Sequence, residues 1–203
     1  MPGILKSHQT VNSAAGVLIV MAMVLISPAY GRTDRPEISF NVTREGEFIR
    51  TEAHVDLHVS PALVWAVLTD YEHYPRFIST MRESKIVSRS PESLVVEQKG
   101  QFDFLFFSQA IEAKLQVSEI PPNLILARAI EGSFRVMDGR YELLSTGNGT
   151  RLNYSGRLVP EFSLPPIVGM HIVRYILLGN FSEMIDEMLR RDAVARRESA
   201  ING

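Results

Sequence analysis

The sequence has no cysteine and no marked excess of charge of either sign. The missing cysteine excludes disulfides, thiolate zinc sites and a lipid anchor on an N-terminal cysteine. The 21 basic and 23 acidic residues give a net charge of −2, so the chain lacks the basic excess typical of nucleic-acid-binding proteins. With 203 residues, 45% of them hydrophobic, it is long enough for one domain with a sizeable core.

The N-terminal segment differs from the rest of the chain. Lys6 is the only lysine, arginine or acidic residue before Arg32, and Ala14–Ile26 is a run of apolar and small residues. That run is shorter than the roughly 20 residues that span a bilayer. Small residues occupy the last and third-last positions before a possible cut after Gly31, as in secretory signal peptides. We therefore expect residues 1–31 to be a cleaved signal peptide, the protein to be exported, in a bacterium to the periplasm, and no stable membrane anchor after cleavage. An uncleaved N-terminal anchor is the alternative.

The remaining pattern predicts strands followed by one long helix. Residues 32–44 are polar and are expected to form a flexible leader. In Phe48–Val59, apolar and polar residues alternate, which predicts a strand with one face in the core. Ser60 and Pro61 are typical of the start of a helix, and a second short helical piece is expected near Tyr71–Met81.

About six more strands follow up to Val159, and the turn at Gly147–Gly149 favours an antiparallel arrangement. Apolar residues recur every three or four positions in Ile167–Arg191, which predicts a long amphipathic helix. Residues 198–203 are expected to be a disordered tail. The sequence thus predicts an α+β fold: two short helices after the first strand, and a curved antiparallel sheet of about seven strands that holds a long C-terminal helix.

Val64–Ile78, with the sequence VWAVLTDYEHYPRFI, resembles the opening of polyketide cyclase/dehydrase and coenzyme Q-binding proteins. Gly147–Tyr154 (GNGTRLNY) and Pro160–Pro165 (PEFSLP), followed by the long helix, are similar to the same group. The group belongs to the START-like, or SRPBCC, superfamily with the helix-grip fold. The resemblance covers about residues 45–191, and we place the domain at 45–197. It implies a cavity between sheet and helix for a lipid, a quinone or other isoprenoid, or an aromatic polyketide, in proteins of which some are enzymes and many are not.

The residues expected to line such a cavity are mostly aromatic or aliphatic: Trp65, Tyr74, Phe77, Phe104, Arg128, Met137, Tyr141, Tyr154, Met170, Val173 and Leu177. Arg128 belongs to this set because it shares a strand face with Leu124, Leu126 and Ile130, which makes it a polar group among apolar ones. The loop at Glu161–Pro166 is expected to rim the entrance and act as a lid.

Two other functions remain open at this stage. The first is a cyclase or dehydratase that uses Asp70, Arg128 or a tyrosine in the cavity. The second is a protein-interaction module whose cavity is collapsed.

His54 and His58 would lie about 13 Å apart on a strand, too far to share a metal ion. The sequence shows no catalytic triad, phosphate loop or acidic metal cluster, so no catalytic residue, metal or cofactor is predicted. The expected partner is a hydrophobic small molecule.

Overall fold

The computed structural model describes residues 35–104, 107–165 and 168–202. The predicted signal peptide lies outside these residues. The described chain forms eight strands, two α-helices and one 3-10 helix. In chain order they are β1 (Ser39–Glu45), β2 (Phe48–Leu57), α1 (Pro61–Leu68), η1 (Tyr71–Arg76), β3 (Met81–Arg89), β4 (Leu94–Phe104), β5 (Phe107–Ile120), β6 (Leu124–Gly132), β7 (Phe134–Thr146), β8 (Gly149–Pro160) and α2 (Gly169–Asn202).

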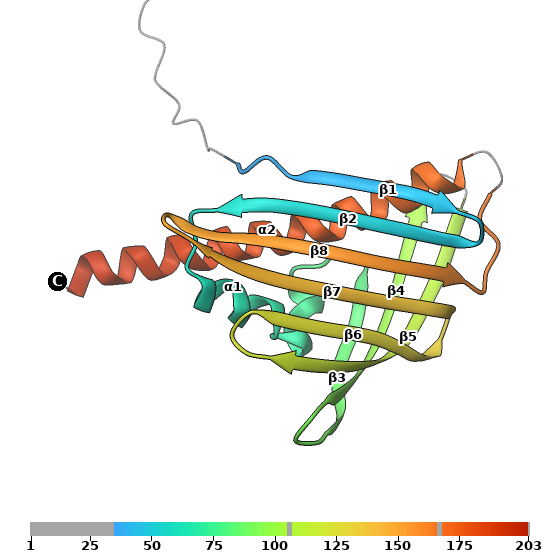
Figure 1. Cartoon of the computed structure of the whole chain (residues 1–203), viewed down its shortest axis with the longest axis horizontal. Coiled ribbons are helices and arrows are strands. Elements are labelled where there is room, and N and C mark those ends of the chain that lie inside the picture. The colour runs from blue at the N-terminus through green and yellow to red at the C-terminus, as the bar shows by residue number, and fades with distance from the viewer. Residues whose placement is uncertain (1–34, 105–106, 166–167, 203) are drawn as a thin grey trace, which may run out of the picture. The chain divides into compact units, whose positions relative to one another are not determined.

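All the strands belong to one antiparallel sheet with the order β1-β2-β8-β7-β6-β5-β4-β3. The sheet curves, and α2 and α1 lie on the same face of it, behind β2, β8 and β7 in the view of Figure 1. This arrangement confirms the predicted helix-grip architecture. No helix in the described part of the chain is both long and apolar enough to cross a membrane.

Alternation along β2 decides which face of the sheet enters the core. Residues from Ile49 to Leu57 at every second position are buried, whereas the residues between them, His54 included, are exposed. Val55, Leu152 and Ile185 have no exposed surface and bring β2, β8 and α2 together in one core. Ser60 accepts a hydrogen bond from the backbone N–H of Leu63, so it caps α1 as expected.

Part of the predicted flexible leader is a strand, because β1 pairs with β2 along its whole length. The aromatic ring of Phe40 lies 6.0 Å from that of Phe181 on α2. The Arg174 guanidinium donates a 2.9 Å hydrogen bond to the carbonyl oxygen of Phe40. These contacts involve residues more than one hundred positions away, which a local pattern cannot reveal.

The predicted disordered tail is also wrong, because α2 continues to Asn202. Residues 193–201 are all exposed, and the end of the helix extends beyond the sheet in Figure 1. The Arg196 and Asp192 side chains, four positions apart, form an ion pair of 2.6 Å on this segment. Such a pair supports a helix that has no apolar face to bury.

β4 runs through Gly100 without a break. A side chain at Gly100 would place its Cβ 2.7 Å from the carbonyl oxygen of Thr80. That oxygen accepts a hydrogen bond of 2.9 Å from the backbone N–H of Gln101. The glycine therefore permits a close approach of two backbones and does not end the strand.

Candidate functional site

A cavity lies between the inner face of the sheet and α2, and it has two lobes. The lobe beside the loop after β8 has a volume of about 180 Å³ and is called the loop lobe. The lobe beside α1 and η1 has a volume of about 210 Å³ and is called the tyrosine lobe. Five residues line both lobes and define the waist of the cavity: Met81, Gln98, Met137, Leu177 and Asn180. Together the lobes reach the lower part of the range of roughly 300–1,000 Å³ found for small-molecule sites.

The loop lobe is closed on one side by aromatic contacts. The ring of Phe162, in the loop after β8, lies 6.4 Å from the ring of Phe102 on β4 and 6.1 Å from that of Phe134 on β7. Leu164 of the same loop and Val173 of α2 also line this lobe. The segment predicted to rim the cavity therefore lies at it and is held there by apolar contacts.

The tyrosine lobe is lined by four tyrosines, two of which have partners inside the protein. The Tyr71 hydroxyl donates a 2.9 Å hydrogen bond to the Glu119 carboxylate, and the Tyr74 hydroxyl donates one of 2.5 Å to the carbonyl oxygen of Leu68. Burial raises the pKa of Tyr71 and that of Tyr74, and nearby acidic groups add to both effects. Both phenols therefore remain protonated and act as hydrogen-bond donors.

The other two tyrosines, Tyr141 and Tyr154, stack with ring centroids 4.7 Å apart. Neither hydroxyl makes a hydrogen bond to another described residue. Burial raises the pKa of Tyr154 to about 12 and that of Tyr141 well above its usual value. The Tyr154 ring lies over Gly156, where a Cβ would come within 2.5 Å of the tyrosine hydroxyl. Gly156 thus provides the space that the ring occupies.

Uncharged side chains make up the whole lining of both lobes, as far as the chain is described. The polar groups there are hydroxyls and amides, of which Gln98 and Asn180 belong to the waist. A buried charge without a partner is costly, so this lining is suited to a neutral, largely apolar molecule. Side chains leave both lobes unfilled, so the core does not collapse into this space.

Six of the predicted site residues line the cavity: Tyr74, Met137, Tyr141, Tyr154, Val173 and Leu177. The side chain of Phe104 lies outside the described residues. Trp65 is half-buried on the flank of α1, because Val64, Val67 and Leu68 form the face that enters the core.

Two further predicted residues lie close to the cavity but do not line it. Phe77 packs against Tyr74 and under the Arg191 guanidinium, which lies 5.7 Å from the centre of its ring. Met170 belongs to the first turn of α2, where Leu164 packs against Gly169, and the lining starts one turn later.

Arg128 is placed on the wrong face by the sequence prediction. It shares a face with Leu126 and Ile130 as expected, but this face is exposed, and Ile125 and Ala127 point inward. The alternation on β6 is misleading because the inward residues include alanines, whereas the outward ones are larger. An alanine facing the cavity leaves space that a leucine would fill.

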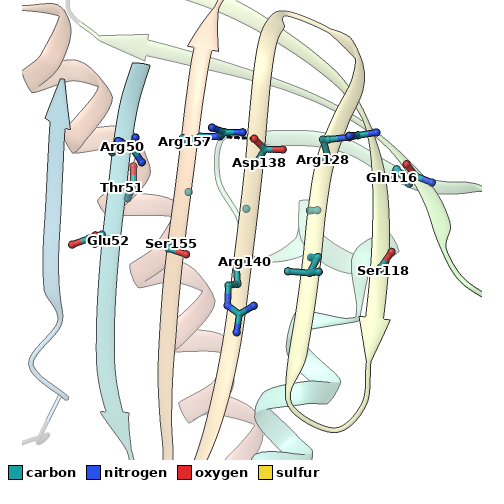
Figure 2. Close-up of a pocket in the computed structure, with 14 residues that line it drawn as sticks. Arg50, Thr51, Glu52, Gln116, Ser118, Arg128, Asp138, Arg140, Ser155 and Arg157 are labelled. Atoms are coloured by element: carbon teal, nitrogen blue, oxygen red, sulfur yellow. Dashed lines mark hydrogen bonds and ion pairs between the residues drawn. The ribbon is translucent and has the colours of Figure 1, made fainter. Parts of the chain in front are cut away.

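Figure 2 shows the outer face of the sheet, where Arg157, Asp138, Arg128 and Gln116 form a row across β8, β7, β6 and β5. They line an open groove of about 530 Å³. Arg157 pairs with Asp138 at 2.7 Å. Exposed ion pairs of this kind contribute little to the stability of the fold. Acidic side chains in the lining balance part of the charge of its arginines. The groove is larger than either lobe, but it has no enclosed, apolar surface for a small molecule.

Asp70, the carboxylate considered for catalysis, lies outside the cavity in an ion-pair junction between η1 and α2. Its carboxylate accepts hydrogen bonds of 2.6 Å from both Arg191 and His73. Burial opposes ionisation of Asp70, but these two partners outweigh it and hold its pKa below the usual value. Glu187, only 7% exposed, bonds to Arg190 and Arg191. Asp70 therefore has a structural role here.

Sequence reasoning missed Gln98 and Asn180. A signal was present in both cases. Asn180 lies three positions after Leu177 and four before Met184, on the apolar face of the long helix. Gln98 follows Leu94 and Val96 in the inward alternation of β4. A polar residue at an otherwise apolar position is the pattern expected of a group that faces a cavity.

A curved antiparallel sheet closed over a cavity by one long C-terminal helix defines a START-like, helix-grip protein. Residues 57–173 match the family model for polyketide cyclase / dehydrase and lipid transport. Since the match covers more than half of the chain, the protein belongs to this family. No curated protein matches the sequence.

Solved structures of the same fold have low sequence identity to this chain. The ZhuI aromatase/cyclase of Streptomyces sp. R1128 is 17% identical with a TM-score of 0.59, over 71% of this chain and 95% of that one. A STAR-related lipid transfer protein of Xanthomonas axonopodis is 14% identical with a TM-score of 0.59, over 74% and 93%. Human STARD10 is 14% identical with a TM-score of 0.58, over 78% and 76%. These likenesses establish the fold, and the family is one of hydrophobic-ligand binding or cyclase activity.

Proposed function

We propose that this protein is exported and binds an uncharged hydrophobic small molecule between its sheet and α2. A lipid, an isoprenoid such as a quinone, or an aromatic polyketide fits this description. The observation that carries the proposal is the lining of the two lobes, which is apolar or neutral throughout. Burial of apolar ligand surface, at roughly 25 cal/mol per Å² before losses, supplies the affinity.

The chemistry of the cavity favours binding over acid–base catalysis. Of the three kinds of residue considered for catalysis, Asp70 and Arg128 lie outside the cavity and only tyrosines lie inside. A tyrosine whose pKa is raised to about 12, as for Tyr154, can donate a hydrogen bond but cannot act as a base near neutral pH. A carbonyl-containing ligand can thus be held by these phenols without being converted.

Export is proposed from the sequence of residues 1–31 alone. Cell fractionation tests it, together with the N-terminal sequence of the protein recovered from its host. A protein that starts after Gly31 in the soluble exported fraction supports cleavage. A chain that keeps residues 1–31 and stays with the membrane identifies the segment as an anchor.

Ligand binding is tested with the protein purified from its own host. Native mass spectrometry followed by organic extraction detects any bound lipid, quinone or polyketide. In parallel, N-phenylnaphthylamine, a neutral dye that becomes fluorescent in apolar surroundings, reports whether the cavity accepts an apolar molecule. A bound hydrophobic compound and saturable dye binding support the proposal. Absence of both overturns it.

A variant that fills the waist shows where the dye binds. Leu177 lines both lobes, so Leu177→Trp narrows the cavity and weakens dye binding at least tenfold. Tyr175, on the same helix and 66% exposed, provides the matched control Tyr175→Trp. Equal dye affinity in the two variants would place the dye outside the cavity.

A further inference from the structure

The waist between the two lobes carries an amide on each side of the cavity. Gln98 comes from β4 and Asn180 from α2, and both line both lobes. They are the only polar residues shared by the two lobes in the described chain. A polar group of a ligand that extends through both lobes must pass these amides.

Each amide is held by one hydrogen bond on the protein side. The Thr80 hydroxyl donates a 2.9 Å hydrogen bond to the side-chain oxygen of Asn180. The Gln98 side-chain NH₂ donates a 3.3 Å hydrogen bond to the hydroxyl of Ser84, which is buried. These bonds orient the amides and use one polar atom of each.

The other polar atom of each amide faces the cavity. The NH₂ of Asn180 and the side-chain oxygen of Gln98 make no hydrogen bond to another described residue. No side-chain nitrogen or oxygen in the described chain is both fully buried and without a partner. Both atoms are therefore accessible, and the accessible space that these residues line is the cavity.

We infer that the waist recognises a hydroxyl in the interior of a neutral ligand, with an apolar part of the ligand in each lobe. A hydroxyl carries both a donor, which suits the Gln98 oxygen, and an acceptor, which suits the Asn180 NH₂. It can equally bond an amide through its nitrogen or its oxygen, so the match does not depend on which way each amide is turned. A carboxylate or phosphate is excluded at this point, because no basic side chain lines the lobes as far as they are described. This inference rests on the proposed binding function.

Displacement of N-phenylnaphthylamine by matched alcohols tests the inference. The first competitor is a saturated fifteen-carbon alcohol with its hydroxyl on the central carbon. The second is its positional isomer with the hydroxyl at the chain end, and the third is the methyl ether of the central alcohol. We expect the central alcohol to bind roughly tenfold more tightly than either of the others. The reason is that a ligand whose polar group lacks a hydrogen-bond partner in the cavity binds about tenfold more weakly.

The preference is then measured within each variant as the ratio of its affinities for the central and the terminal alcohol. A change in the cavity that affects both affinities equally therefore cancels. Gln98→Met combined with Asn180→Leu removes both amides at nearly constant volume, and we expect the two positional isomers to bind it equally. Gln116→Met, the same kind of substitution on the outer face of the sheet, should keep the wild-type ratio.

The outcomes separate the inference from the proposed function. Dye binding with no preference among the competitors leaves the binding function standing and overturns the recognition of a hydroxyl. A preference that persists in the double variant also overturns it, because the selectivity then comes from other groups. If the wild-type protein neither binds the dye nor carries a hydrophobic compound from its host, the binding function itself is refuted, and the inference fails with it.

Discussion

The junction between η1 and α2 gives a quantitative prediction for Glu187→Gln. The Glu187 carboxylate is only 7% exposed and accepts hydrogen bonds of 2.6 and 2.8 Å from Arg190 and one of 2.7 Å from Arg191. Arg191 in turn bonds to Asp70, which precedes η1. The carboxylate thus fixes the arginine that joins the two elements.

Replacing this carboxylate by a neutral amide weakens three charge-assisted hydrogen bonds. Hydrogen bonds to charged groups contribute about 1.5–3 kcal/mol to stability. We expect Glu187→Gln to lower the free energy of unfolding at pH 7 by about this amount. For a domain of this size, that corresponds to a decrease of roughly 3–12 °C in Tm. Thermal unfolding followed by circular dichroism measures it.

The effect must also depend on pH with a defined sign. Hydrogen bonds from Arg190 and Arg191 lower the pKa of Glu187 in the folded protein. In the unfolded chain the pKa of a glutamate is about 4.3, so the stabilisation is complete above that pH and is lost as the pH falls through the lower folded pKa. The difference in Tm between wild type and Glu187→Gln should therefore be largest at neutral pH and shrink in acid.

Asp192→Asn is the matched control, because Asp192 pairs with the exposed Arg196 on the same helix. A surface pair of this kind contributes about 0.3–0.5 kcal/mol, so the control should change Tm by no more than about 2 °C. The reasoning is refuted if Glu187→Gln is as mild as the control, or if its effect is the same in acid as at neutral pH.

Two further predictions concern the cavity and the outer face. Gly156→Ala should push the Tyr154 ring from its place, cost about 1–3 kcal/mol and weaken dye binding, because its Cβ would lie 2.5 Å from the tyrosine hydroxyl. Gly147→Ala, which meets nothing within 4 Å, is the control, and equal dye affinity in the two variants would contradict the packing argument. Arg128→Ala should leave dye binding unchanged and stability within about 0.5 kcal/mol, because Arg128 is exposed on the outer face. A weakened dye affinity would instead mean that Arg128 contributes to the cavity.

Local patterns predict the elements of the fold that bury one clean face. β2 alternates strictly, and the apolar positions of α2 from Phe181 to Met188 enter the core as their spacing requires. β1 escapes this reasoning because its inward residues, Phe40 and Val42, are only half-buried, and its partner Arg174 is remote in sequence. Pairing with the neighbouring β2 makes this segment a strand.

The candidate site is less predictable, because residues that face a cavity do not follow the hydrophobic pattern of residues that face a core. Side chains that face a core are large, but side chains that face a cavity can be small or polar. On β6, Ala127 lines the tyrosine lobe, whereas Leu126 faces outward and is 36% exposed. A rule that assigns the larger apolar residues to the interior therefore selects the wrong face and brings Arg128 inside with them.

The small inward residues have an energetic consequence that bears on function. Ala113, Ala127 and Gly139 stand on adjacent strands, and each lines a lobe. At about 24 cal/mol per Å³, an empty space of the size of the tyrosine lobe corresponds to roughly 5 kcal/mol of lost stability. That is comparable with the whole free energy of unfolding of a marginally stable domain. Larger residues at these positions would restore part of this lost stability, but they would also fill the space. A ligand that occupies the lobes stabilises the folded protein by mass action and does not remove the space. With such a lining, the free energy of unfolding should therefore rise with ligand concentration.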